Sequence, residues 1–264
     1  MKKLSLLLTC IFMHGMLSAC SGERYTELMN AARDGNNKAV MRAISGGAKV
    51  DQRTSQGKTA LMLAAAKGHL DTVKLLIENG ADVNLEDGYG TSPIIVAATA
   101  NKYQVIEELI KHGANPSKRD SSGGSALDNA VFYGHKESVK ALLQGTEKIE
   151  ADQAAELLLM SAGLGHKEIV ESLVNFGVDV NSRGKKQRTA LIAATRFDRL
   201  KVVEYLLQHG ADLSLRDADG NSALDIAKQR QQTDMIALFQ RAPTATTPPQ
   251  TPADSPSDTT QAPQ

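Results

Sequence analysis

Histidine and aspartate are the side chains of this sequence that could bind a metal ion or transfer a proton. Beyond the first 20 residues they recur at equivalent points: His69, His135 and His166 each follow a glycine, His112 and His209 each precede one, and Asp87, Asp120 and Asp217 lie in loops. No two of these histidines have the i, i+4 spacing of zinc ligands on a helix. The recurrence indicates a structural role, so no metal site, cofactor or catalytic residue is predicted.

Composition narrows the possible classes of protein further. The 264 residues include 30 basic and 30 acidic side chains, a balance that argues against nucleic acid as a partner. The two cysteines, Cys10 and Cys20, lie near the N-terminus, which excludes disulfides and thiolate metal sites from the rest of the chain. The sequence also lacks phosphate-binding loops and nucleophile motifs. It therefore predicts a binding protein rather than an enzyme.

A repeat of about 33 residues organises the chain after its first 23 residues. Three positions recur in register through seven units, and hold large aliphatic, small and β-branched residues respectively. They are Leu28, Leu61, Ile94, Leu127, Leu158, Leu191 and Leu224; Ala31, Ala64, Ala97, Ala130, Ser161, Ala194 and Ala227; and Val40, Val73, Ile106, Val139, Val170, Val203 and Ile236. We expect the large residues to bury the facing sides of two short helices, and the small ones to let neighbouring helices approach closely.

Signals for helix boundaries fit this register. A hydroxyl residue that can cap the first helix precedes it in six units: Thr26, Thr59, Ser92, Ser125, Thr189 and Ser222. Pro93 suits the first helical turn, where no backbone N–H is needed. Glycines that can adopt a left-handed conformation follow the second helix: Gly80, Gly113, Gly177 and Gly210. Each unit is thus predicted to be a helix, a turn, a second helix and a loop.

One unit, "GKTALMLAAAKGHLDTVKLLIENGADVN" at residues 57–84, resembles the ankyrin repeat through its "TAL", "GH", "VKLL" and "NGADVN" segments. The resemblance implies an all-α solenoid of about seven repeats, counting the caps, with helix-turn-helix units and β-hairpin fingers over residues 24–241. We use "finger" for the loop between one repeat's second helix and the next repeat's first. Polar residues such as Lys38, Arg42, Lys228 and Arg230 suit the outer faces of the end repeats.

Two segments depart from the repeat. The spacing from Gly134 to Gly165 is 31 residues, and Glu156 stands at the position of the capping hydroxyl, so the finger there is predicted to be shortened or misshapen. Residues 242–264 contain six of the eight prolines and no large apolar residue. This composition predicts a disordered tail.

The first 19 residues have the pattern of a signal peptide, with a charged "MKK" start followed by an apolar run. Leu17-Ser18-Ala19-Cys20 resembles the lipobox of bacterial lipoproteins, which implies cleavage before Cys20 and its acylation with fatty acids such as palmitate. Residues 20–23 would then form a short tether, and Ser21 favours the outer membrane. The alternatives are an ordinary signal peptide with a chance cysteine, and a minor cytosolic form that starts at Met13 or Met16.

The residues just before each Gly-His turn are expected to line a concave groove and to contact a partner. Three aromatic residues fall there, Phe132, Tyr133 and Phe197, and Tyr89 lies at the tip of a finger. Aromatic residues and arginine dominate interface energetics, although each of these aromatics could instead pack sideways within the stack. A basic cluster lies nearby in the sixth unit: Arg183, Lys185, Lys186, Arg188, Arg196 and Arg199. It either steers an acidic partner or is a solvated face.

Ankyrin-repeat lipoproteins of the periplasm resemble immunity proteins that neutralise phospholipase effectors of type VI secretion. The alternative is a group of periplasmic ankyrin scaffolds that support catalase and oxidant defence. Five residue steps from Cys20 to Tyr25, at about 3.5 Å each, keep the first repeat within roughly 17 Å of the membrane. That distance favours a partner that acts on lipid. We therefore expect a lipid-anchored protein that is a monomer when free. Its expected partner is a secreted phospholipase and not nucleic acid.

Overall fold

The computed structural model describes residues 25–241, which divide after Ile149 into two compact units. Unit 1 covers residues 25–149 and unit 2 covers residues 150–241. The predicted signal peptide, the lipidated Cys20, the alternative starts and the Pro-rich tail lie outside the described residues. Among residues 25–241, no helix has the length and apolar character needed to cross a membrane.

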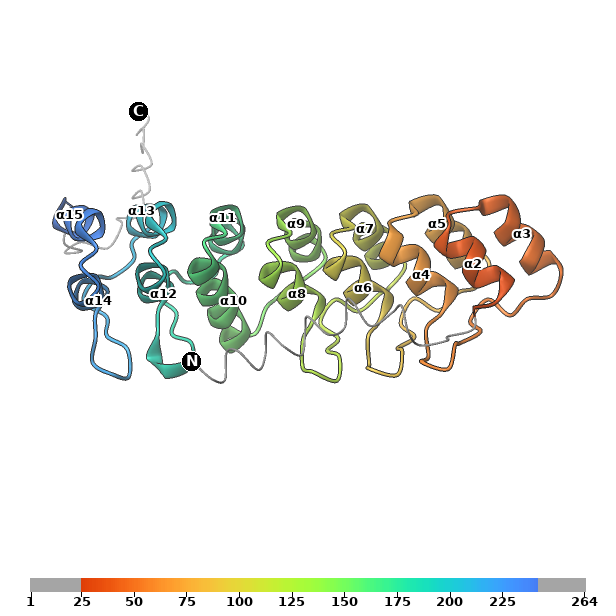
Figure 1. Cartoon of the computed structure of the whole chain (residues 1–264), viewed down its shortest axis with the longest axis horizontal. Coiled ribbons are helices and arrows are strands. Elements are labelled where there is room, and N and C mark those ends of the chain that lie inside the picture. The colour runs from red at the N-terminus through yellow and green to blue at the C-terminus, as the bar shows by residue number, and fades with distance from the viewer. Residues whose placement is uncertain (1–24, 242–264) are drawn as a thin grey trace, which may run out of the picture. The chain divides into compact units, whose positions relative to one another are not determined.

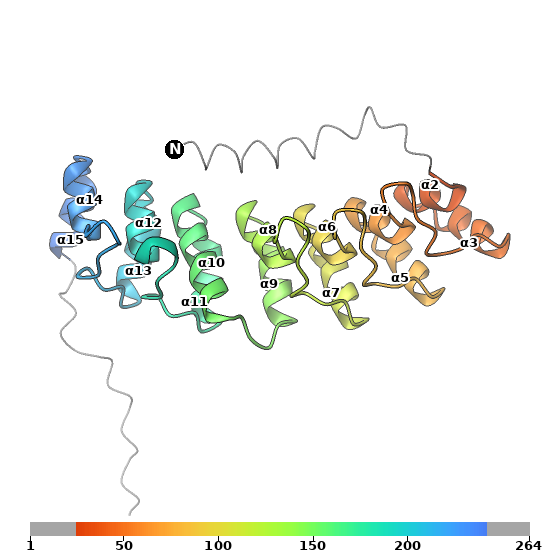
Figure 2. The ribbon, with the colours of Figure 1, turned by 90° about the horizontal axis from the view of Figure 1, so that it is seen from below.

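Unit 1 consists of four helix pairs (Figure 1). Their bounds are α2 (Glu27–Arg33), α3 (Asn37–Ser45), α4 (Ala60–Lys67), α5 (Leu70–Glu78), α6 (Pro93–Thr99), α7 (Tyr103–Lys111), α8 (Ala126–Phe132) and α9 (Lys136–Gln144). The first helices α2, α4, α6 and α8 pack against one another in chain order, as do the second helices α3, α5, α7 and α9. The unit therefore has two layers, visible in Figure 2.

Unit 2 repeats this arrangement with three pairs. Its helices are α10 (Ala151–Leu164), α11 (Lys167–Asn175), α12 (Ala190–Arg196), α13 (Leu200–Gln208), α14 (Ala223–Gln229) and α15 (Thr233–Arg241), with a short 3₁₀ helix η2 (Lys185–Gln187) in a finger. Again α10, α12 and α14 form one layer and α11, α13 and α15 the other. The 14 α-helices of residues 25–241 confirm the predicted all-α class. The fingers contain turns and two isolated antiparallel bridges, Arg119 with Ser125 and Arg216 with Ser222, but no longer strand within the described range.

Hydroxyl caps start most of the first helices, as predicted. Thr26, Thr59 and Thr189 each accept a hydrogen bond from the backbone N–H three residues later. Ser125 and Ser222 form full capping boxes with the aspartates three residues on. Ser92 is the exception: its hydroxyl is buried and has no hydrogen-bond partner. The glycines after the second helices are left-handed, with φ between 83° and 102° at Gly80, Gly113, Gly177 and Gly210.

The three recurring positions form the core. In the first six repeats the large aliphatic and β-branched residues are at most 5% exposed, and the small residues at most 7%. Each leucine, isoleucine or valine side chain buried in this way contributes about 1.5–3 kcal/mol to folding. In the last repeat Leu224 and Ile236 are only half-buried, because no further repeat packs on them within residues 25–241. The predicted register is confirmed.

The residue just before the second helix ties neighbouring repeats together in several repeats. In unit 1, ring nitrogen Nε2 of His69 lies 3.0 Å from the Arg33 carbonyl oxygen, and Nε2 of His135 lies 3.1 Å from that of Thr99. In unit 2, Arg199 donates to the carbonyl of Gly163 over 3.1 Å from the same position. The carbonyls that receive these contacts lie near the ends of the preceding first helices, where intrahelical partners are lacking. These two histidines therefore have a structural role, as the sequence indicated.

The predicted irregularity lies at the start of unit 2. Helix α10 has 14 residues, whereas the other first helices have seven or eight. It begins at Ala151, after a short loop that takes the place of a full finger. The interpretation of Glu156 as a substitute for the capping hydroxyl was wrong, because this residue lies inside α10 rather than at its start. The two missing residues are thus accommodated by shortening the loop and lengthening the helix.

Candidate protein-binding surface

In unit 1 the exposed aromatic site is the end of α8. Tyr133 is 39% exposed, and its ring makes an edge contact with Phe132, at 5.1 Å between centroids, and stacks on His135 at 5.8 Å. Partial burial raises the pKa of the Tyr133 hydroxyl, which keeps it a neutral donor. Phe132 is half-buried and supports Tyr133. The sequence left open whether these aromatic residues are exposed or pack within the stack. Tyr133 is exposed, whereas Phe132 packs partly within the stack.

Tyr89 lies on the finger before α6 and is 50% exposed. Its backbone N–H donates to Asp87 Oδ1 over 2.9 Å, and its carbonyl accepts from the N–H of Ser121 in the next finger over 2.8 Å. The backbone is therefore held on both sides while the ring remains at the surface. A rigid aromatic side chain of this kind loses little entropy when a partner covers it.

In unit 2 the corresponding site is the end of α12. Phe197 is 50% exposed, and Leu164, at the end of α10, is 38% exposed. A Cβ atom at Gly163 would lie 3.3 Å from Cδ2 of Phe197, so the ring rests over a glycine within a helix. Leu164 directly precedes the turn Gly165-His166, at one of the positions where the sequence predicts exposed residues. Phe197 and Leu164 are thus both exposed apolar side chains of unit 2.

Arg196 has a structural partner. Its Nη2 donates to Oδ2 of Asp217 over 3.3 Å, and Nε of Arg188 lies 3.9 Å from the same oxygen. The Asp217 side chain is fully buried, and its Oδ1 accepts from the N–H groups of Asp219 and Asn221. The sequence did not predict this ion pair, because the arginines and the aspartate come from different repeats. Arg196 is therefore engaged within unit 2, and its contact with a partner stays a prediction.

The other basic residues lie on the finger before α12. Arg183, Lys185 and Lys186 are exposed, and neither lysine has an ion-pair partner among the described residues. Arg183 donates to the carbonyl of Arg216 over 3.2 Å. Asp198 is the single acidic residue between positions 182 and 200, a stretch that contains six basic residues. The predicted basic cluster therefore falls into two groups: Arg183, Lys185 and Lys186 are exposed on the finger, and Arg188 and Arg196 lie beside the buried Asp217.

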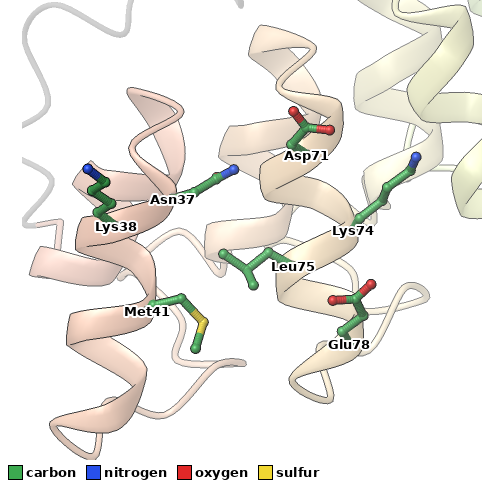
Figure 3. Close-up of a pocket in the computed structure, with 7 residues that line it drawn as sticks. All are labelled: Asn37, Lys38, Met41, Asp71, Lys74, Leu75 and Glu78. Atoms are coloured by element: carbon green, nitrogen blue, oxygen red, sulfur yellow. The ribbon is translucent and has the colours of Figure 1, made fainter.

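A shallow groove of about 600 Å³ lies between the second helices α3 and α5 of unit 1 (Figure 3). Met41 and Leu75 provide its apolar lining, and charged side chains surround them: Lys38, Asp71, Lys74 and Glu78. Met41 is 41% exposed, and this exposed apolar side chain is what marks the groove. The sequence alone could not reveal it, because it does not show which side chains are exposed to solvent. Nothing about the groove indicates a reaction, and residues 25–241 contain no cluster of three or more metal-ligating side chains.

Family models match much of the chain. The model described as ankyrin repeats (3 copies) matches residues 4–87 and 157–245, and the one described as ankyrin repeats (many copies) matches residues 76–130. The chain belongs to the ankyrin-repeat family. Members of this family typically serve as protein-interaction scaffolds without catalytic activity, and no enzyme family is indicated for this ankyrin-repeat protein. A protein-binding role follows.

Similar proteins are varied. The chain is 32% identical over 116 residues to alpha-latrocrustotoxin-Lt1a of Latrodectus tredecimguttatus, and 31% identical over 123 residues to human ankyrin repeat and SOCS box protein 11. These segments are 43% and 46% of this chain, but only 8% and 38% of the relatives. The crystal structure of the ankyrin repeat domain of that human protein has a TM-score of 0.71 and 28% identity, and covers 84% of this chain and 100% of its own.

The crystal structure of the ankyrin repeat domain of Bcl-3, a member of the IkappaB protein family, is also similar. It has a TM-score of 0.70 and 25% identity, and the match covers 82% of this chain and 98% of that one. What these proteins share with this chain is therefore the ankyrin-repeat architecture.

Proposed function

We propose that this ankyrin-repeat protein is a lipid-anchored binding protein of the bacterial envelope that captures a secreted phospholipase and neutralises it. The observation that carries the proposal is the exposure of Tyr133 and Phe197 at equivalent positions of two repeats. Large aromatic side chains left half in solvent are typical anchors of protein interfaces. The mechanism is steric: the bound repeats cover the active-site entrance or the membrane-docking face of the lipase.

The leader supports the envelope part of the proposal. Leu17-Ser18-Ala19-Cys20 fits a lipobox, and several acyl chains on Cys20 would anchor the protein stably. The short tether would hold the first repeat within roughly 17 Å of the bilayer, where a lipase acts. Labelling with radioactive palmitate tests this step. Wild-type protein should take up label and sediment with outer membranes, and Cys20→Ala should do neither.

The binding test uses Ser21–Gln264, the mature chain without the acylated Cys20, and a candidate phospholipase encoded beside it. Hydrolysis of phospholipid vesicles should fall to background at equimolar protein. Tyr133→Ala or Phe197→Ala should each weaken inhibition by roughly 30-fold, which corresponds to about 2 kcal/mol. Tyr103→Ala is the matched control, because Tyr103 is 40% exposed but starts the second helix α7. Unimpaired hydrolysis at saturating protein would rule the proposal out.

The periplasmic scaffold for oxidant defence remains the alternative, and deletion strains separate the two. Loss of a neutralising protein should expose cells to killing by siblings that secrete the lipase. Loss of a scaffold for catalase should instead leave peroxide sensitivity. A cytosolic form from Met13 or Met16 would be recognised as a pool of protein that disappears when both codons are changed.

A further inference from the structure

The finger before α12 lacks the side chain that organises the corresponding turn in other fingers. Asp87, Asp120 and Asp217 each accept hydrogen bonds from the backbone N–H groups two and four residues later. Gly184 occupies that position in the finger before α12, and it has no side chain to do so. Its backbone N–H nevertheless donates to the carbonyl of Arg188 over 2.9 Å, so the turn closes in the same way.

A carboxylate from another helix reaches this turn, although it bonds the N–H one residue after Gly184 rather than those two and four residues later. Glu156 of α10 accepts a hydrogen bond at Oε1 from the backbone N–H of Lys185, with 2.6 Å between the two atoms. A Cβ atom built on Gly184 would lie 3.0 Å from the same Oε1. The carboxylate of Glu156 therefore fills the space that an aspartate at position 184 would use.

The turn has a conformation that is unfavourable for its residues. Lys186 and Gln187 have φ values of 60° and 55°, in the left-handed region that disfavours side chains with a Cβ. The carbonyl of Lys186 accepts from the N–H of Ala218 over 2.8 Å, which fixes the turn from the opposite side. Two strained residues persist only where surrounding contacts hold them, and such strain is concentrated at binding sites.

From this geometry we infer that Glu156 is a positioning residue that holds the finger 183–188 in the shape that presents Lys185 and Lys186 to an acidic polypeptide. The inference rests on the proposed binding role and names the chemistry of the partner. The partner is acidic because both lysines are exposed without ion-pair partners among the described residues, and because Arg183 of the same finger is also exposed. Glu156 itself does not contact the partner.

The test uses the mature chain and poly-L-glutamate as a surrogate acidic polypeptide. Affinity is measured at 50 and 300 mM salt, since a contact between exposed charges weakens with salt. Replacing both lysines, Lys185→Gln with Lys186→Gln, should reduce affinity about tenfold at low salt. If this pair has no effect, the basic finger is not the acidic-binding surface and the inference fails, whereas the proposed function, which is carried by Tyr133 and Phe197, is not affected.

Variants of Glu156 distinguish positioning from simple charge. Glu156→Ala removes a negative charge, so a charge effect alone would strengthen binding to poly-L-glutamate. Positioning predicts the opposite, a loss of about fivefold, because the turn must be reordered on binding. Glu156→Gln is the conservative control, since its amide oxygen can still accept from Lys185 N–H and binding should not fall.

A second substitution, inside the finger itself, should restore the turn. In the double variant Glu156→Ala with Gly184→Asp, an aspartate returns to the usual position and the net charge equals that of the wild type. We expect affinity within twofold of wild type. Hydrogen exchange of the Lys185 amide should be faster in Glu156→Ala. In the double variant the amides of Lys186 and Arg188 should exchange more slowly, because an aspartate at this position accepts from the N–H groups two and four residues later, while amides of α12 remain unchanged.

Two results overturn the inference on positioning while leaving the proposed function intact. One is unchanged or tighter binding by Glu156→Ala together with faster exchange at Lys185, which would make the turn irrelevant to binding. The other is tighter binding to phosphatidylglycerol vesicles than to poly-L-glutamate, lost in the Lys185→Gln, Lys186→Gln variant. That result would assign the finger to an anionic membrane rather than to an acidic polypeptide.

Discussion

The fingers before α6 and before α12 make similar turns by different means. In the first, Asp87 Oδ1 accepts from the N–H groups of Tyr89 and Thr91, and Gly90 takes the left-handed position with φ 73°. In the second, Gly184 and Gln187 occupy the places of aspartate and glycine, and Glu156 supplies the carboxylate from α10. The first turn is encoded locally, whereas the second depends on a neighbouring helix.

The difference shows where conformational strain collects in this protein. The local turn of unit 1 places an aromatic ring at the surface without unfavourable backbone at its tip. The turn of unit 2 places two lysines at the surface with left-handed backbone at Lys186 and Gln187. Its shape is therefore sensitive to changes outside the loop, and the following substitutions test that dependence.

The largest effect is expected from the buried aspartate. Asp217→Ala removes the acceptor of two backbone N–H groups and the counter-ion of Arg196 and Arg188, and should lower the free energy of unfolding of unit 2 by about 3 kcal/mol. Hydrogen exchange of the α14 amides in the full chain measures this loss of stability.

Asp120→Ala is the matched control in unit 1. Asp120 also caps its turn but pairs with no arginine in the described contacts, so about 1 kcal/mol is expected. Equal costs at the two positions would contradict the importance of the ion pair.

The next effect concerns the caps at the ends of the fingers. Ser222→Ala should cost about 1 kcal/mol, because its hydroxyl both accepts from the N–H of Asp225 and donates to the carboxylate. Ser92→Ala should cost close to nothing, since its buried hydroxyl has no partner and alanine removes an unsatisfied polar atom. Urea unfolding of the full chain compares the two. A larger loss for Ser92→Ala would show that this hydroxyl has a partner in solution.

A smaller gain is expected where a side chain occupies a left-handed position. Gln187→Gly should stabilise unit 2 by about 0.5 kcal/mol, because relief of the strain exceeds the entropy that glycine loses on folding. Gly90→Ala should act in the opposite direction in unit 1, since the new Cβ would lie 3.1 Å from the backbone nitrogen of Ser121. Thermal unfolding of both variants measures these changes. A loss of stability in Gln187→Gly would show that the glutamine side chain makes a contact worth more than the strain.

The smallest expected effect is on pH dependence. Hydrogen bonds from the Ser222 side chain and backbone, with Arg216 contributing less, lower the pKa of Asp225 from 3.8 to about 2. Because the folded-state pKa is depressed, the stabilisation is present above about pH 4 and is lost as the pH falls towards 2. In Asp225→Asn this part of the acid sensitivity should disappear from an unfolding titration between pH 2 and pH 5. A variant with the same acid profile as the wild type would refute the assignment.

Much of the fold could be predicted because its signals are local. The position of Leu61 and its equivalents, the hydroxyl caps and the glycines after the second helices depend on residues a few places apart. Ser92 was mispredicted as a bonded cap, because the pattern gives the residue type but not the hydrogen bond. The position of Glu156 inside a helix was not predicted, because the 31-residue spacing shows that two residues are missing but not that the residues before Leu157 join the helix.

Less of the candidate surface could be predicted. The sequence singled out Tyr133, Leu164 and Phe197 by their position before a turn, but it did not reveal Met41, which is 41% exposed on a second helix. The basic run looked like one cluster, yet Arg196 and Arg188 face the buried Asp217 while Lys185 and Lys186 remain in solvent. A charge pattern along the chain carries no information on which charges meet across repeats.

By itself the sequence determined the repeat, its register and its capping chemistry, since these arise from contacts between residues close along the chain and from a strict period. Only the tertiary structure decided which side chains interact across repeats. Glu156 accepts a hydrogen bond from the finger at Gly184, and Asp217 pairs with the two arginines. The physical reason is that such contacts join residues 20 to 30 positions apart, and their energy depends on distances and burial that the fold alone sets.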